Sequence, residues 1–321
     1  MNEKFKNICN MSQVVLKKYV ENMLRITHDD ITVADGFVFA KGTFPVLLVA
    51  HMDTVHDSLP DVILYDMQND SLSSPNGIGG DDRCGIYMIL EIIKRYHCSV
   101  LFCEDEESGG IGARKFIKTD LAKELQFNYA IEFDRKGSHD AVFYDCDNEE
   151  FEEFITSDFY ETAYGSFSDI SVVAPFLKCA AVNLSCGYYN AHTKKECVVL
   201  KEMEASMEAA CKILDRTTED DKFEYIEAKY NNYYGAYYGS SYYGNSYYQQ
   251  GNYNSYGKDW YDTYEDVFTT YYLIEYHNGN GKTDWFETYA VSEAEAVGRF
   301  LMWNPGLCYN NIIDVMVDKE Y

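Results

Sequence analysis

The sequence predicts an α/β protein with a mostly parallel central sheet that is covered by helices on both faces. Apolar segments of strand length alternate with segments of helical periodicity between residues 45 and 216. This alternation is typical of parallel strands joined by crossover helices. A composition change near residue 220 and a hairpin signal near residue 280 predict that a small ββαβ unit follows the first domain.

The individual elements follow from these patterns in order. The start of the chain is predicted to form an amphipathic helix. Strands are predicted for PVLLVAH (45–51), DVILYDM (61–67), SVLFCEDEE (99–107), YAIEFDR (129–135) and KCAAVNLSC (178–186). Helices are predicted for residues 82–96, 111–125, 148–156 and 199–216. In such a sheet, functional sites form beyond the carboxyl ends of the strands.

Composition divides the chain into three predicted regions. Residues 1–220 have the composition of a globular domain. Residues 221–265 consist mainly of Tyr, Asn, Gly and Ser and hold nearly half of the 30 tyrosines, which predicts a low-complexity linker. The linker is either a plain tether or an adhesive segment for self-association or a protein partner. Residues 266–321 are predicted to form the ββαβ unit, with a turn at 278–281 and a helix that Ser292 caps.

Charge and cysteine usage exclude several classes of function. The net charge of −26 argues against nucleic acid or an anionic membrane as a partner. No apolar run approaches the ~20 residues of a membrane span, and the start lacks the apolar stretch of a secretion signal. Ten cysteines are scattered singly, which favours reduced thiols and a cytoplasmic protein.

Seven acidic and histidine residues in five segments have the composition of a two-metal site. Zinc takes imidazole and carboxylate ligands, and two neighbouring ions need a shared carboxylate plus a histidine and a second carboxylate each. Five residues supply this set: His51, Asp81, Glu107, Asp134 and His192. Asp53 and Glu106 lie beside them in the sequence.

Each segment alone has a simpler interpretation. His51 follows an apolar strand and suits a buried core histidine, and residues 104–107 suit a solvated acidic loop. Asp81 precedes a helix and suits a cap, and His192 suits an exposed turn. One metal site explains all of these segments together, so the joint interpretation is favoured.

The five segments HMDTV, GIGGDDRCG, EDEESGGIGA, EFDRKG and YNAHTKKECV resemble the successive motifs of the co-catalytic dizinc peptidases. That superfamily includes peptidase T, the glutamate carboxypeptidases and the double-zinc aminopeptidases. The resemblance implies a three-layer zinc-exopeptidase-like fold and two Zn²⁺ ions, with Co²⁺ or Mn²⁺ as alternatives. It implies that Asp81 bridges the ions, that His51 and Asp134 complete one ion, and that Glu107 and His192 complete the other.

The same resemblance assigns the remaining roles. Asp53 is expected to orient His51, and Glu106 is expected to be the general base that takes a proton from a zinc-activated water. The bond between Asp81 and Asp82 is expected to be cis. Asp169 lies in a segment that resembles a loop near the site, where it is expected to help bind a substrate amine.

The resulting prediction is a zinc-dependent hydrolase that cleaves amide bonds of short peptides in the manner of an aminopeptidase. An Asp at the position of Asp134 accompanies aminopeptidases in this superfamily. The gaps between the motifs are too short for the lid domain of many relatives, so a bare catalytic domain is expected. One alternative is an amidase or deacylase acting on N-acyl or cell-wall-derived small amides. The other is a non-catalytic binding or assembly protein with a peptidase core, but a metal scaffold has no need of Glu106.

Overall fold

The computed structural model describes residues 3–165, 167–228, 270–278, 282–290, 300 and 311–317. The chain divides into two units, Met1–Asn232 and Tyr233–Tyr321, and each is described by itself.

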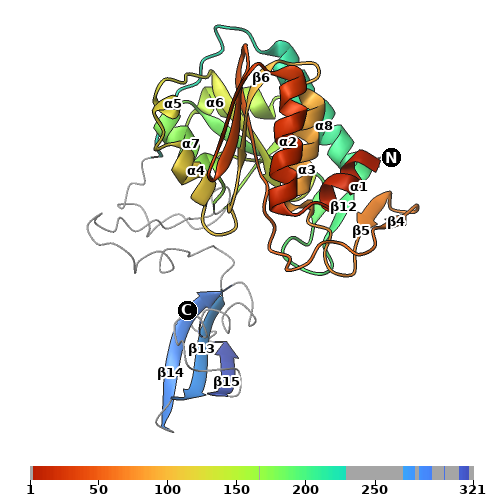
Figure 1. The fold of residues 1–321 in the computed structure, drawn as a ribbon. Coiled ribbons are helices and arrows are strands. Elements are labelled where there is room, and N and C mark those ends of the chain that lie inside the picture. Colours follow the sequence, from red (N-terminus) through yellow and green to blue (C-terminus); the bar gives the residue numbers. More distant parts are fainter. Residues whose placement is uncertain are drawn as a thin grey trace. The chain divides into compact units, whose positions relative to one another are not determined.

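The first unit is built on an eight-stranded sheet with the order β1-β2-β6-β3-β7-β10-β8-β9 (Figure 1). The strands are β1 (Asp30–Ala34), β2 (Phe37–Lys41), β3 (Phe44–His51), β6 (Cys98–Cys103), β7 (Tyr129–Arg135), β8 (Asp140–Val142), β9 (Glu161–Ala163) and β10 (Ala181–Ser185). The central strands β6, β3, β7 and β10 are all parallel to their neighbours in this group, and β1, β2 and β8 add antiparallel pairs outside them. The predicted mostly parallel α/β fold is therefore confirmed.

Helices cover both faces of this sheet. One face packs against α1 (Glu3–Cys9), α2 (Gln13–Thr27), α3 (Gly80–Ile92), α6 (Glu149–Thr156) and α8 (Leu200–Arg216). The other face packs against α4 (Ile111–Phe116), α5 (Asp120–Lys123) and α7 (Ile170–Leu177). Figure 1 shows α2, α3 and α8 on the opposite side of the sheet from α4, α5 and α7.

The central strand β3 shows why its sequence is apolar throughout. Leu48 and Ala50 face the core on the side of α3, whereas Leu47 and Val49 face the core on the side of α4 and α7. All four side chains are fully buried. Because successive residues of a strand point to opposite faces, a strand covered on both sides needs apolar residues at every position.

Three sequence-based predictions differ from the structure. The segment 61–67 forms only the short strand β4 (Leu64–Asp66), at the edge of a separate sheet with β5 (Ser71–Ser73), β11 (Tyr188–Tyr189) and β12 (Cys197–Val199). All residues of β4 are exposed, so this apolar segment is not a buried strand of the central sheet. The helix predicted for 111–125 is two helices, because the Thr119 hydroxyl caps a new one at α5. The first predicted helix is likewise divided at Ser12, which caps α2.

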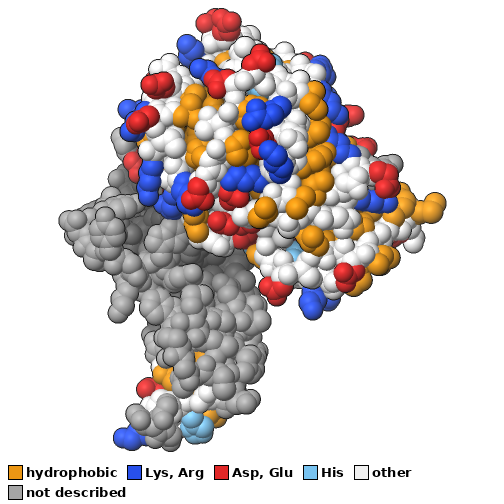
Figure 2. Space-filling model, viewed as in Figure 1, with side chains coloured by type: hydrophobic (Ala, Val, Ile, Leu, Met, Phe, Trp, Pro, Cys, Tyr) orange, Lys and Arg blue, Asp and Glu red, His pale blue; other side chains and the backbone are white. Residues whose placement is uncertain are grey.

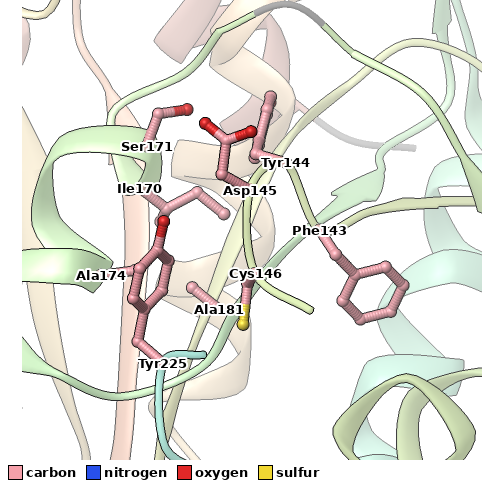
Figure 3. A pocket seen from close by; sticks show the side chains of 9 residues that line it. All are labelled: Phe143, Tyr144, Asp145, Cys146, Ile170, Ser171, Ala174, Ala181 and Tyr225. Atoms are coloured by element: carbon pink, nitrogen blue, oxygen red, sulfur yellow. The ribbon is translucent and has the colours of Figure 1, made fainter. Parts of the chain in front are cut away.

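The chain after α8 packs on the first unit. The backbone nitrogen of Phe223 donates to the backbone oxygen of Asn128, and its backbone oxygen accepts from the nitrogen of Ala180. Its ring packs against Tyr129 and Phe151. Figure 3 shows the Tyr225 side chain beside residues of α7 and β10 at a cavity of about 10 Å³, which has room for one water at most. The described chain thus continues in contact with the first unit past residue 220, the predicted start of the linker, to Ala228.

The described part of the second unit is an antiparallel sheet with the order β14-β13-β15. Its strands are β13 (Thr270–His277), β14 (Thr283–Ala290) and β15 (Ile312–Val317). Apart from residues 221–228 of the predicted linker and residue 300 of the helix that Ser292 was predicted to cap, these two segments lie outside the described residues. Across the described residues of both units, none of the helices has the length and apolar character needed to cross a membrane.

Candidate metal centre

The carboxyl ends of three neighbouring parallel strands bring the predicted site residues together. His51 ends β3, Glu106 and Glu107 follow β6, and Asp134 lies near the end of β7. Asp81 comes from the first turn of α3, next to these strand ends. The site therefore forms where parallel α/β sheets place their ligands.

His192 reaches the same place from the loop between β11 and β12, where its backbone is left-handed with φ 61°. Its side chain is about half exposed, at 54%. The site is therefore open to solvent on the side of this loop.

Asp81 lies between the two histidines. Its Oδ1 is 3.1 Å from Nε2 of His51, and its Oδ2 is 3.2 Å from Nε2 of His192. One carboxylate thus presents one oxygen to each imidazole. The peptide bond between Asp81 and Asp82 is cis, as the motif resemblance implied.

The other acidic residues divide between the two histidines. Asp134 Oδ1 lies 3.5 Å from Nε2 of His51, and Glu107 Oε1 lies 3.1 Å from Nε2 of His192. Two groups of ligand atoms result, each with all atoms within 4.8 Å of one another: His51 with Asp81 and Asp134, and His192 with Asp81 and Glu107.

Asp53 contacts both His51 and the loop that follows β6. Its Oδ1 lies 3.1 Å from Nδ1 of His51 and accepts a hydrogen bond from the backbone nitrogen of Glu106 at 3.0 Å. Its Oδ2 accepts a hydrogen bond from the backbone nitrogen of Glu107 at 3.0 Å. Because the Asp53 carboxylate accepts a hydrogen bond from Nδ1–H, the Nε2 of a neutral His51 presents its lone pair to the centre.

This arrangement fits a bound cation. The Nε2 of His51 faces oxygens of Asp81 and Asp134. When His51 is neutral with its proton on Nδ1, all of these atoms are acceptors. Even a protonated ring nitrogen has one hydrogen to donate, and it faces more than one carboxylate oxygen. A divalent ion satisfies several such ligands at once, and imidazole with carboxylate is the ligand set of zinc.

The titration of the acidic groups agrees with this assignment. Burial, together with the Asp81 carboxylate, raises the pKa of Asp134 to about 7. Burial also raises the pKa of Glu106 well above its usual range. Hydrogen bonds to Asp81 and Glu107 raise the pKa of His192 to about 11. The acidic groups therefore need positive charge nearby to be ionised together at neutral pH.

Glu106 lies beside the two groups. Its Oε2 is 4.0 Å from Nε2 of His51, and its side chain is largely buried. It belongs to a third group of ligand atoms, with His51 and Glu107. A buried carboxyl at this distance from the centre is in position to exchange a proton with a water there.

Sequence reasoning missed Glu196, which holds the backbone around Asp81. Its fully buried carboxylate accepts hydrogen bonds from the backbone nitrogens of Gly79, at 2.8 Å, and Asp81, at 3.0 Å. Its Oε2 also lies 2.7 Å from Nε2 of His56. In the sequence Glu196 ends a charged turn, and no local pattern distinguishes it from a solvated residue.

Sequence reasoning also missed Arg83, the largest fully buried side chain among the residues that the structure describes. Its guanidinium donates to the backbone oxygens of Met52 and Asp53, at 2.5 and 3.1 Å, and so holds the turn after β3. Beside it, the fully buried Asp82 accepts a hydrogen bond from the backbone nitrogen of His51 at 3.3 Å. These two residues hold the backbone of His51 and Asp53 in place.

Asp169 is buried, and the residue before it in the sequence contacts the centre. Its side chain is fully buried, and neither carboxylate oxygen has a hydrogen-bond partner among the described residues. Burial raises its pKa to about 7. The neighbouring Ser168 donates to Asp134 Oδ2 at 2.9 Å. The role of Asp169 in binding a substrate amine stays a prediction.

A cavity of about 330 Å³ adjoins His192. It is lined by two loops, residues 55–58 and 192–194, together with Asn76. Its size is at the lower end of the range for small-molecule sites.

No protein-family model matches the sequence, and no curated protein sequence matches it. Several solved structures are similar. Aminopeptidase PepT from Bacillus cereus superposes with a TM-score of 0.55 and 13% identity, over 66% of this chain and 96% of that chain. An aminopeptidase from the archaeon Desulfurococcus kamchatkensis gives a TM-score of 0.53 and 14% identity, over 67% and 94%. The chain has an aminopeptidase fold.

A tripeptidase from Staphylococcus aureus shares this aminopeptidase fold, with a TM-score of 0.52 and 12% identity over 66% of this chain and 96% of that chain. The fold agrees with the superfamily that the five motifs resemble. The aminopeptidase fold thus confirms the expected architecture around the cluster of acidic and histidine residues.

Proposed function

We propose that this protein is a metal-dependent hydrolase that cleaves peptide bonds of short peptides near a free amino terminus, with two zinc ions as cofactor. The observation that supports this best is the position of Asp81, which presents one oxygen to His51 and the other to His192. Asp134 and Glu107 supply one further carboxylate on each side. When bound there, zinc supplies Lewis-acid chemistry that polarises a carbonyl group and makes water more acidic.

The protein residues then have distinct tasks. Glu106 accepts a proton from the attacking water and returns it to the leaving amine, because its carboxyl is buried beside the ligand groups. Asp53 keeps the proton of His51 on Nδ1 and holds the loop of Glu106 and Glu107 in place. The acidic groups attract a substrate ammonium by charge.

A substrate panel tests this function. The zinc-loaded protein is assayed on aminoacyl anilides, tripeptides and N-acyl amides, with Glu106→Gln as the matched variant. We expect hydrolysis of substrates with a free amino group, and a loss of about 10²-fold or more in kcat for Glu106→Gln with zinc content unchanged. Preferred cleavage of N-acyl amides would support the amidase instead. A metal-loaded protein that hydrolyses nothing would support a binding or assembly protein.

A further inference from the structure

The cavity beside His192 has walls that are fixed to each other. On one loop, the Thr193 hydroxyl donates to the backbone oxygen of Asn190 at 2.8 Å, and the backbone oxygen of Thr193 accepts from the Glu196 backbone nitrogen at 3.1 Å. On the other loop, His56 lies 2.7 Å from the buried carboxylate of Glu196. Glu196 therefore connects both walls to each other and to the backbone of Asp81.

Two charged side chains of opposite sign line this cavity. Lys194 belongs to the loop of His192, and Asp57 belongs to the facing loop. Lys194 is exposed, and within the described ranges of the chain it forms no ion pair. The candidate metal centre is rich in carboxylates, whereas Lys194, on the same loop as His192, carries a positive charge. Such a cavity suits a ligand with an ammonium at one end and a carboxylate at the other.

We propose that Lys194 binds the terminal carboxylate of the short peptide substrate and so selects peptides with a free carboxyl end. This inference rests on the proposed function. The ammonium end is attracted to the acidic centre, and the carboxylate is attracted to Lys194, two residues along the chain from His192. A cavity of about 330 Å³ at this place has room for a ligand the size of a short peptide. Asp57 on the facing loop repels a carboxylate, which favours the side of the cavity where Lys194 lies.

A matched pair of substrates tests the role of Lys194. The rates kcat/KM are measured for Ala-Ala-Ala and for its C-terminal amide, with the zinc-loaded protein and its Lys194→Gln and Lys195→Gln variants. Lys195 is the control, because it is the adjacent exposed lysine and does not line the cavity. We expect Lys194→Gln to lower kcat/KM for Ala-Ala-Ala about twofold to fivefold and to leave the amide unchanged. Lys195→Gln should change neither.

Equal effects of Lys194→Gln on both substrates, or the same effect from Lys195→Gln, would overturn the carboxylate site while leaving the hydrolase intact. Calorimetry separates the two proposals when turnover is absent. Zinc-loaded Glu106→Gln protein should bind Ala-Ala-Ala more tightly than its amide, and adding Lys194→Gln should remove the difference. Such discrimination without hydrolysis by the parent protein supports the carboxylate site and refutes the proposed catalysis. Failure of both ligands to bind, or equal binding of the two, overturns the carboxylate site.

Discussion

The buried carboxylate of Glu196 accepts a hydrogen bond of 3.0 Å from the backbone nitrogen of Asp81. Asp81, which faces His51 and His192, is thereby held by a carboxylate that contacts neither of these two histidines. The second oxygen of Glu196 accepts from Gly79 and faces His56, so each oxygen has a task. Groups that orient metal ligands in this way affect metal affinity although they are not ligands themselves.

Glu196→Gln should therefore weaken metal binding. The glutamine keeps one acceptor oxygen but places an NH₂ group against a backbone N–H donor, which leaves a buried donor without a partner. We expect zinc affinity to fall roughly 10-fold to 100-fold and stability to fall about 1–3 kcal/mol. Competition with a chelator and urea unfolding measure the two effects. Glu204→Gln, an exposed substitution on α8, is the control, and unchanged zinc affinity in Glu196→Gln would refute the positioning role.

Asp81→Asn should remove most of the bound metal. The carboxylate offers one oxygen on the side of each imidazole, whereas an amide is uncharged and has a single acceptor oxygen. Elemental analysis should find about two zinc ions in the parent protein and one or none in the variant. The exposed substitution Asp158→Asn should keep both ions. Two tightly held ions in Asp81→Asn would show that Asp81 does not bridge them.

The sequence predicted which residues lie together best where a candidate ligand follows a recognisable strand. His51 ends an apolar run, and Glu106, Glu107 and Asp134 lie at the ends of other runs, so their meeting followed from parallel strand geometry. His192 lies in a loop, and only its order among the five motifs indicated its position. The structure brings all of these residues together.

Other features had a short local signal or none. The hairpin of β1 and β2 extends the sheet at one edge, although the turn residues Asp35 and Gly36 between its strands were available as a hint. Glu196 and Arg83 are charged residues that only tertiary contacts bury. Residues 223–228 lie in the segment that was predicted to be a linker, and their packing depends on Phe223 meeting rings of β7 and α6. Burial of this kind is a property of distant partners and not of a sequence window.

The metal-free protein should lose stability as pH rises from about 4 to 7. Burial and Asp81 raise the pKa of Asp134 from its usual 3.8 to about 7. In this range the folded state binds more protons than the unfolded state, so the free energy of unfolding decreases with pH. Zinc should reverse the trend, because it binds the ionised ligands and stabilises the folded state more as they lose protons.

Thermal unfolding at pH 5 and pH 7.5, with a chelator or with zinc, checks this. The stabilisation by zinc should be larger at pH 7.5. In Asp134→Asn the decrease with pH in the metal-free protein should be smaller, because this variant lacks the titrating carboxyl. A metal-free parent protein that is more stable at pH 7.5 than at pH 5 would contradict the assignment.

The last prediction concerns where the first unit ends. A protein that ends at Ala228 should fold and keep its metals, because every ligand and the packed segment 223–228 are present. A protein that ends at Thr218 lacks Phe223, whose ring contacts Tyr129, Phe151 and Phe154. Its loss exposes these rings and leaves the backbone groups of Asn128 and Ala180 without partners.

The free energy of unfolding of the shorter protein should therefore be about 2–4 kcal/mol lower than that of the longer one. Phe223→Ala in the full chain should reproduce the part of this loss that comes from the ring. The exposed substitution Ile226→Ala serves as its control. Equal stability of the two truncated proteins would mean that segment 223–228 adds nothing to the fold. If Phe223→Ala is harmless while the truncation is not, the backbone pairing with Asn128 and Ala180 holds the segment in place.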